Sequence, residues 1–253
     1  NLLIGTLAVL VSSLILDIQN TKVLLGAMQV FFIMGFANSM NDILDFKTDF
    51  INHPKRVLVN KKITQQESLF ICSVFLLFSL FISLFIHSVS NYFLWLIVFP
   101  LIIFYNIFFK KTPIIGNLMV SFLLASIFIY AEILLTNTIN YLIIPSILVA
   151  CLSLIRELIK DMHDIQGDKK NNFKTLPILL GAKISRIIIS GLMAFFGFLF
   201  LLPYFFGIYG IKYLILLVFL IEIPLVYSIF VLINYSSIKA FKKLIKLHKL
   251  LTI

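Results

Sequence analysis

Two short segments hold most of the acidic side chains of this chain, and their residue types could bind cations. The first segment reads Asn41-Asp42-Ile-Leu-Asp45-Phe-Lys-Thr-Asp49, and the second reads Asp161-Met-His-Asp164-Ile-Gln-Gly-Asp168. Six of the eleven Asp and Glu residues lie in these two segments. Each segment follows a long apolar run, where ionisable groups are costly and mark a functional site. We therefore expect a site for divalent cations and phosphate groups at a membrane face.

The acids in each segment recur at intervals that place them on one face of a helix. Asn41, Asp45 and Asp49 are spaced i, i+4 and i+8, and Asp164 and Asp168 repeat the i, i+4 interval. Unpartnered carboxylates stacked in this way repel one another, so a bound cation is a natural counter-ion. Oxygen ligands alone suit Mg²⁺. Two facing clusters would hold a diphosphate through metal bridges, and the metal would stabilise the charge of a departing diphosphate.

Basic side chains near the two segments are expected to clamp the same phosphate oxygens. These cations are Arg56, Arg156 and Lys160, and an Arg side chain offers a two-pronged fork to phosphate. The alternative is that all these charges form a solvated surface with local ion pairs. The recurrence of the pattern at two helix ends disfavours that alternative.

The elements that must position these residues are membrane-spanning helices. The chain has 253 residues, of which 61% are hydrophobic and 13% charged, whereas a soluble domain is about half apolar and about a quarter charged. Runs of about 20 apolar residues predict spanning helices, and alternating segments of a β-barrel are absent. We predict an all-α polytopic bundle with eight spans, at residues 2–16, 23–40, 69–86, 92–109, 117–135, 141–158, 187–206 and 211–235. The basic tail, residues 236–253, is either an interfacial amphipathic helix or the start of a ninth span.

The distribution of Lys and Arg predicts how the bundle is oriented. The chain has 21 such residues, and all but Lys22 and Lys212 lie near the ends of the even-numbered spans or in the connections that follow them. By the positive-inside rule these connections lie in the cytoplasm, together with both acidic segments. We expect a multi-pass protein of the cytoplasmic (inner) membrane with its active site on the cytoplasmic side. The net charge of +10 then reflects topology and contact with anionic lipid, and no nucleic-acid partner is expected.

At these residues the chain resembles the UbiA superfamily of intramembrane prenyltransferases. Asn41, Asp45 and Asp49 match the family's Asn-x3-Asp-x3-Asp motif, and Asp164 and Asp168 match its Asp-x3-Asp motif. The stretch Asn52-His-Pro-Lys-Arg56 resembles the family's Asn-x-Pro-x-Arg. The segments Tyr105-Asn-Ile-Phe-Phe-Lys110-Lys111, Gly116-Asn117 and Thr175-Leu-Pro-Ile-Leu-Leu-Gly181 are also similar to family signatures and follow in the same order.

The resemblance implies a bundle of nine spans around a central cavity open to lipid. It implies a polyprenyl diphosphate donor, a Mg²⁺ cofactor and a lipophilic acceptor that captures an allylic carbocation. The implied metal ligands are Asn41, Asp45, Asp49, Asp164 and Asp168. The implied diphosphate contacts are Asn41, Asp42, Arg56, Lys110, Lys160 and Asp161. The implied catalytic residues are Asp45, Asp49, Asp164, Asp168 and Tyr105. The ring of Tyr105 would face the carbocation.

The second motif looks most like that of the digeranylgeranylglyceryl phosphate synthases within the superfamily. Their acceptor is geranylgeranylglyceryl phosphate, an ether-lipid precursor. Homogentisate prenyltransferases and chlorophyll synthases carry similar patterns, so an aromatic acceptor in quinone-type biosynthesis stays open. Val57 and His163 depart from the family pattern, and His163 is expected to weaken metal binding or make it depend on pH.

A single domain, residues 1–253, is expected, incomplete at both ends because no ninth span is visible. A transporter with an acidic ion site is the alternative class, but its acids would lie at mid-membrane rather than at helix ends. A scaffold protein would not need two metal-spaced clusters. Two further residues are expected outside the main site: Glu132 either lines the acceptor cavity or is a neutral or interfacial side chain, and His248 reads as a surface residue of the tail.

Overall fold

The computed structural model describes residues 2–86, 89–235 and 237–252, and it contains no strand in that part of the chain. The α-helices are α1 (Leu2–Ile15), α2 (Thr21–Leu44), α3 (Phe46–Asn52), α4 (Gln65–Ser83), α5 (Val89–Phe93), α6 (Phe99–Ile107), α7 (Ile115–Thr136), α8 (Ile143–Lys170), α9 (Leu176–Leu180), α10 (Ala182–Phe205), α11 (Ile211–Leu217), α12 (Ile223–Asn234) and α13 (Ile238–Leu251). Two π-helical segments, Leu94–Val98 and Val218–Glu222, join α5 to α6 and α11 to α12. A 3₁₀ turn, Phe109–Lys111, precedes α7. The all-α prediction is confirmed.

Six helical stretches of the described chain are long and apolar enough to cross a membrane. They are Thr21–Leu44, Gln65–Ser83, Val89–Ile107, Ile115–Thr136, Ala182–Phe205 and Ile211–Asn234. The two other expected spans are also helices, but α1 is shorter and α8 carries the second acidic segment in its C-terminal half. The predicted multi-pass membrane class is therefore confirmed. Six helices of the described chain, rather than the eight expected, are long and apolar enough to cross a membrane.

The spanning helices pack through small residues on one side and present large apolar side chains on the other. A Cβ added to Gly26 of α2 would lie 2.3 Å from Leu134 Cδ2 of α7, and one added to Gly35 would lie 2.7 Å from the ring of Phe75 on α4. Helices in lipid associate by such close approach because apolar burial alone does not favour contact between them. Side chains such as Phe70 and Phe206, both more than 70% exposed, are left to face lipid.

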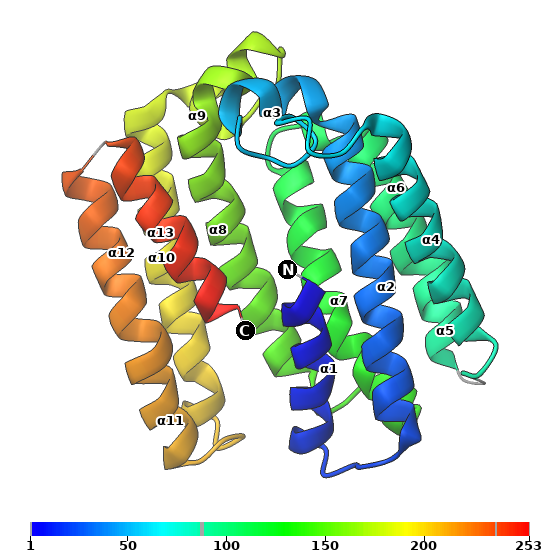
Figure 1. Ribbon diagram of the computed structural model, residues 1–253. Helices are drawn as coiled ribbons and strands as arrows, with labels where there is room; N and C mark the ends of the chain where they lie inside the picture. Colours follow the sequence, from blue (N-terminus) through cyan, green and yellow to red (C-terminus); the bar gives the residue numbers. More distant parts are fainter. Residues whose placement is uncertain (1, 87–88, 236, 253) are drawn as a thin grey trace.

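The bundle has two packed halves that meet along α7 and α8 (Figure 1). One apolar core joins α2, α4 and α7 with the segments around α6, and the other joins α8 with α10, α12 and α13. The short helices α3 and α9 lie across the same end of the bundle, at the top of Figure 1. This end therefore collects the polar segments that follow α2, α6 and α8.

The basic tail forms α13, which packs against the bundle beside α8 and α12. Its side chains Phe241, Leu244 and His248 are buried, and His248 Nε2 lies 3.1 Å from Ser228 Oγ. The expectation that His248 is a surface residue was wrong: it is fully buried. The helix is amphipathic as predicted, but its apolar face contacts protein.

Glu132 anchors a loop rather than lining an acceptor cavity. Its fully buried side chain accepts hydrogen bonds from the backbone N–H groups of Asn140 and Tyr141, each at 2.7 Å, and of Leu142 at 2.9 Å. These donors precede α8, where a helix start leaves N–H groups without intrahelical partners. The carboxyl group therefore fixes the turn between α7 and α8, and of the two alternatives for Glu132 the cavity-lining one was wrong.

Candidate active site

The two acidic segments meet because α3 folds back onto α8. Asn52, the last residue of α3, is bonded twice to α8: its Nδ2 donates to the Asp164 carbonyl oxygen at 3.2 Å, and its Oδ1 accepts from the Gly167 N–H at 2.9 Å. A Cβ at position 167 would lie 2.3 Å from Asn52 Oδ1, so only glycine admits this contact. The amide of Asn52 thus sets the spacing between the two segments.

The spacing of the first acidic segment predicted one straight helix, but the helix is interrupted. The helix α2 ends at Leu44, Asp45 lies at the junction, and α3 begins at Phe46. The Asp45 N–H still donates to the Asn41 carbonyl oxygen and the Asp49 N–H to that of Asp45, both at 2.9 Å. These bonds keep Asp45 and Asp49 adjacent although the helix is interrupted.

The carboxylates of the first segment are paired with cations, and those of Asp45 and Asp49 are also buried. Lys110 Nζ donates to both Asp45 and Asn41, and Arg56 Nη1 donates to Asp49 and, at 2.8 Å, to Asp42. Asp45 is 9% and Asp49 4% exposed. Burial raises the pKa of Asp49, although the guanidinium of Arg56 opposes the shift. The carboxylates thus carry internal counter-ions, and neither a solvated surface nor an unpartnered stack describes them.

Asp164 on α8 lies between two histidines. His163 Nδ1 is 2.6 Å from Asp164 Oδ1, and His53 Nε2, which follows α3, is 3.3 Å from Asp164 Oδ2. The two imidazole rings are stacked with centroids 6.0 Å apart. Burial alone would raise the pKa of Asp164, but the hydrogen bonds from His163 and His53 outweigh it and hold that pKa well below its usual range. Asp164 is therefore ionised at neutral pH.

The other two aspartates of α8, Asp161 and Asp168, are held closer to their protonated forms. Burial, together with the neighbouring Asp164 carboxylate, raises the pKa of Asp168 to about 7. Burial also raises the pKa of Asp161 to about 8, although Asn117 Nδ2 donates to its Oδ2 at 2.9 Å. Protons therefore compete with cations for these two side chains near neutral pH.

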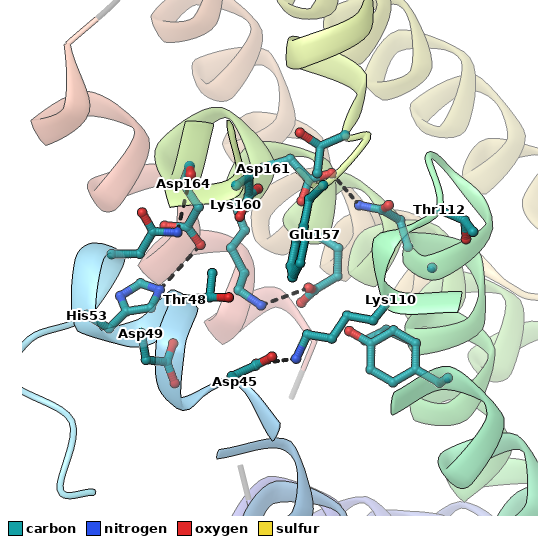
Figure 2. Close-up of a pocket in the computed structure, with 18 of the residues that line it drawn as sticks. Asp45, Thr48, Asp49, His53, Lys110, Thr112, Glu157, Lys160, Asp161 and Asp164 are labelled. Carbon is teal, nitrogen blue, oxygen red and sulfur yellow. Dashed lines mark hydrogen bonds and ion pairs between the residues drawn. The ribbon is translucent and has the colours of Figure 1, made fainter. Parts of the chain in front are cut away.

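The side chains of both segments line a small cavity, which we call the polar cavity. Its volume is about 70 Å³, and Figure 2 shows Asp45 and Asp49 on one wall facing Lys160, Asp161 and Asp164 on the other. Its charged lining consists of Asp45, Asp49, Glu157, Asp161, Asp164, Asp168, Arg56, Lys110 and Lys160, with His53 beside them. Two residues expected here, Asn41 and Asp42, do not line it, because the interruption at Asp45 turns them toward a second cavity.

The second cavity is far larger, and we call it the apolar cavity. Its volume is about 620 Å³, and it extends between α1, α2, α6, α7 and α8 among side chains such as Ile33, Leu94 and Phe128. The two cavities share a boundary formed by Arg56, Tyr105, Val120, Glu157 and Lys160. Tyr105 thus lies between a polar compartment and an apolar one. Arg156, expected to share phosphate oxygens with Lys160, lines only the apolar cavity.

The polar cavity fits Mg²⁺ held together with a phosphate-bearing ligand. Within residues 2–86, 89–235 and 237–252, no three His, Cys, Asp or Glu side chains are close enough to complete a cation site by themselves. Mg²⁺ usually takes one or two carboxylates and completes its octahedron with waters and substrate phosphates. The carboxylates of Asp45 and Asp49 on one wall, and of Asp164 and Asp168 on the other, are oxygen donors of the type that this metal prefers.

Sequence reasoning missed several side chains of the polar cavity. Glu157 lies at the boundary of the two cavities and contacts Arg156 at 2.8 Å and Lys160 at 3.2 Å. His53 contacts Asp164, and Thr48 lies on the wall of α3. Glu157 precedes Asp161 by four residues, so the helical spacing of the second segment was the signal that pointed to it.

The comparisons with known proteins agree on one family. A family model described as the UbiA prenyltransferase family matches residues 2–250. Digeranylgeranylglyceryl phosphate synthase of Methanosphaera stadtmanae is 32% identical over 250 residues, which cover 99% of this chain and 91% of that protein. A solved structure concerned with digeranylgeranylglyceryl phosphate synthase in membranes has a TM-score of 0.70 at 30% identity, covering 98% of this chain and 88% of the other. A UbiA homologue from Archaeoglobus fulgidus bound to GPP and Mg²⁺ shares the fold, with a TM-score of 0.71 at 18% identity, covering 99% and 92%.

Proposed function

This chain belongs to the UbiA prenyltransferase family, and on that premise we propose that it transfers a geranylgeranyl group from its diphosphate to geranylgeranylglyceryl phosphate. One observation carries the proposal. A small cavity walled by carboxylates opens beside a large apolar cavity, and five residues line both. A prenyl diphosphate has a matching division between a charged head and an apolar tail.

The diphosphate head belongs in the polar cavity. Asp45 and Asp49 on one side and Asp164 and Asp168 on the other would hold Mg²⁺, which supplies positive charge to the leaving diphosphate when it is bound. The donor's phosphate oxygens would be met by the cations that line the same cavity, Arg56, Lys110 and Lys160. Asn41, Asp42 and Asp161 support this set indirectly, because they contact Lys110, Arg56 and Asn117.

The transfer then takes place at the boundary of the two cavities. The bond between the allylic carbon and the diphosphate oxygen breaks, and the diphosphate leaves with the electron pair. Tyr105 presents an aromatic ring where the allylic cation forms. The acceptor hydroxyl oxygen bonds to that carbon and releases its proton to Glu157, the carboxylate that lines both cavities. The apolar walls exclude water, which would otherwise capture the cation.

The placement of basic residues supports a cytoplasmic active site in the inner membrane. The polar cavity is lined by residues of α3 and by Thr175 at the start of α9, and these two helices lie at one end of the bundle (Figure 1). The connections at this end carry most of the Lys and Arg residues. We also propose that the chain acts as one domain, since both packed halves contribute walls to the site.

A transfer assay in reconstituted vesicles tests this function. Labelled geranylgeranyl diphosphate is offered with geranylgeranylglyceryl phosphate or with a panel of aromatic acids, with and without Mg²⁺. We expect Mg²⁺-dependent product on the glyceryl phosphate, and a loss of about 10³-fold in Asp45→Asn and Asp164→Asn. The control variant is Asp17→Asn, because Asp17 is exposed and lies outside both cavities.

The outcomes of this assay separate the alternatives. Product on an aromatic acid alone would overturn the acceptor assignment and retain prenyl transfer. A folded protein that does not bind geranylgeranyl diphosphate in the presence of Mg²⁺ would overturn prenyl transfer itself. Full activity in Asp45→Asn and Asp164→Asn would refute the placement of the site.

A further inference from the structure

The two cavities differ in the sign of their charged linings. The polar cavity has more carboxylates than cations, whereas the apolar cavity has four cations, Arg56, Arg156, Lys160 and Lys249, against Asp42 and Glu157. An apolar cavity with a net positive wall would attract an amphiphile with an anionic head. The donor's head has its own cavity, so this second positive wall calls for another anionic group.

Two of these four cations do not line the polar cavity. Arg56 is held by Asp42 and Asp49, and Lys160 lines both cavities. Arg156 and Lys249, by contrast, line only the apolar cavity. Within the part of the chain that the structure describes, Lys249 has no carboxylate partner.

Arg156 has unused hydrogen-bonding capacity at this wall. Its Nη1 donates to Glu157 Oε1 at 2.8 Å, but its Nε–H is buried and has no acceptor among the described residues. A buried donor without an acceptor costs free energy. The planar guanidinium suits the oxygens of a phosphate group, which it binds in a two-pronged geometry.

Lys249 is placed on the wall of the apolar cavity by the packing of α13. Phe241, Leu244 and His248 fix that helix on the bundle, and Lys249 and Thr252 then reach the cavity wall. Burial and the charge of Arg156 lower the pKa of His248 to about 4, so this histidine is neutral. His248 therefore adds no charge to this wall, and Glu157 is the carboxylate that faces Arg156.

We propose that Arg156 and Lys249 bind the phosphate head of the acceptor, so that this wall selects an anionic amphiphile over a neutral one. The inference rests on the proposed function and assigns a specificity role to residues that the donor does not need. Arg156 immediately precedes Glu157, which lies at the cavity boundary. A phosphate on Arg156 would hold the neighbouring glycerol hydroxyl close to the reacting carbon, because the phosphate and hydroxyl carbons of a glyceryl phosphate are adjacent.

Kinetics with paired acceptors test this role. The full chain is reconstituted in neutral phosphatidylcholine vesicles, so that no anionic lipid head competes, and supplied with Mg²⁺ and geranylgeranyl diphosphate. Geranylgeranylglyceryl phosphate is compared with geranylgeranylglycerol, which lacks the phosphate. We expect Lys249→Gln to raise KM for the phosphorylated acceptor about tenfold, the loss of one charge-assisted contact. KM for the donor should stay unchanged.

Three further variants make the test specific. Lys249→Arg should restore the low KM because it keeps the charge. Lys246→Gln, which changes an exposed lysine one turn earlier on α13, should match the unaltered protein. Arg156→Lys should raise KM for the phosphorylated acceptor and reduce the preference for it over the alcohol, because the fork is lost while the charge stays.

The inference and the proposed function fail in different ways. Equal KM values in Lys249→Gln and Lys246→Gln, or no preference for the phosphorylated acceptor, would overturn the phosphate wall while prenyl transfer stands. A rise in donor and acceptor KM together would also overturn it, since the wall would then serve the donor. Absence of any Mg²⁺-dependent turnover of geranylgeranyl diphosphate would overturn both.

Discussion

Lowering the pH from 8 to 6 is expected to weaken Mg²⁺ binding about tenfold, because Asp168 must lose a proton before its carboxylate can bind a cation. Burial and the Asp164 carboxylate raise the pKa of Asp168 to about 7 without metal. A carboxyl with that pKa is about nine-tenths protonated at pH 6 and about one-tenth protonated at pH 8. A raised carboxyl pKa favours the protonated form at low pH, so affinity for the metal rises with pH through 7.

Isothermal titration of Mg²⁺ into the detergent-solubilised protein with a non-reactive diphosphate analogue measures this effect. The dissociation constant is determined between pH 6 and pH 8, and proton release is measured in buffers of different ionisation enthalpy. Asp164, whose pKa lies well below its usual range, contributes no change in this window. Asp161, whose pKa is about 8, also titrates in this window, so a variant is needed to isolate the contribution of Asp168.

Two variants decide whether the reasoning holds. Asp168→Asn should bind Mg²⁺ more weakly and lose most of the dependence on pH, whereas Asp17→Asn should behave as the unaltered protein. An affinity that is constant from pH 6 to pH 8 would refute the argument. So would an undiminished dependence on pH in Asp168→Asn.

Two further substitutions separate structural from functional residues. Glu132→Ala should lower the free energy of unfolding by about 3 kcal/mol, because three backbone N–H groups lose their acceptor. Thermal unfolding in detergent measures this loss, and Glu67→Ala, at an exposed position, should lower the stability less. An unchanged melting temperature in Glu132→Ala would contradict the capping role. Val120→Phe should lower kcat about 100-fold, because a ring at the boundary of the two cavities displaces the reacting groups. Leu118→Phe, at a half-exposed position, is the control. Equal rates in the two variants would exclude that boundary as the place of transfer.

The sequence was sufficient to predict the helical bundle and the meeting of the acidic segments. Long apolar runs leave a membrane chain few options besides helices, because backbone groups in lipid must bond internally. The i, i+4 spacing of Asp164 and Asp168 predicted that both lie on one helix face, and α8 continues through both of them to Lys170. The spacing around Asp45 predicted the right neighbours but not the end of α2 at Leu44.

Contacts between distant segments could not be derived from local patterns. The bond of Asn52 to α8, the pairing of Lys110 with Asp45 and the burial of His248 all depend on tertiary packing. A lysine beside an apolar run has the same local appearance whether it faces solvent or a carboxylate. Glu132 was ambiguous for the same reason, since the N–H groups it binds lie eight to ten residues later.

The pairing of Asp45 with Lys110 and of Asp49 with Arg56 has a consequence for how the protein rests between turnovers. Because these cations of the same chain balance the charge of the carboxylates, treatment with a chelator should leave the bundle folded and able to bind Mg²⁺ again. Under the proposed function, binding of the donor would be an exchange, in which Lys110 and Arg56 turn from carboxylate oxygens to phosphate oxygens. Affinity for the donor would then reflect the difference between two sets of ion pairs, and the original pairs would re-form when the diphosphate product leaves.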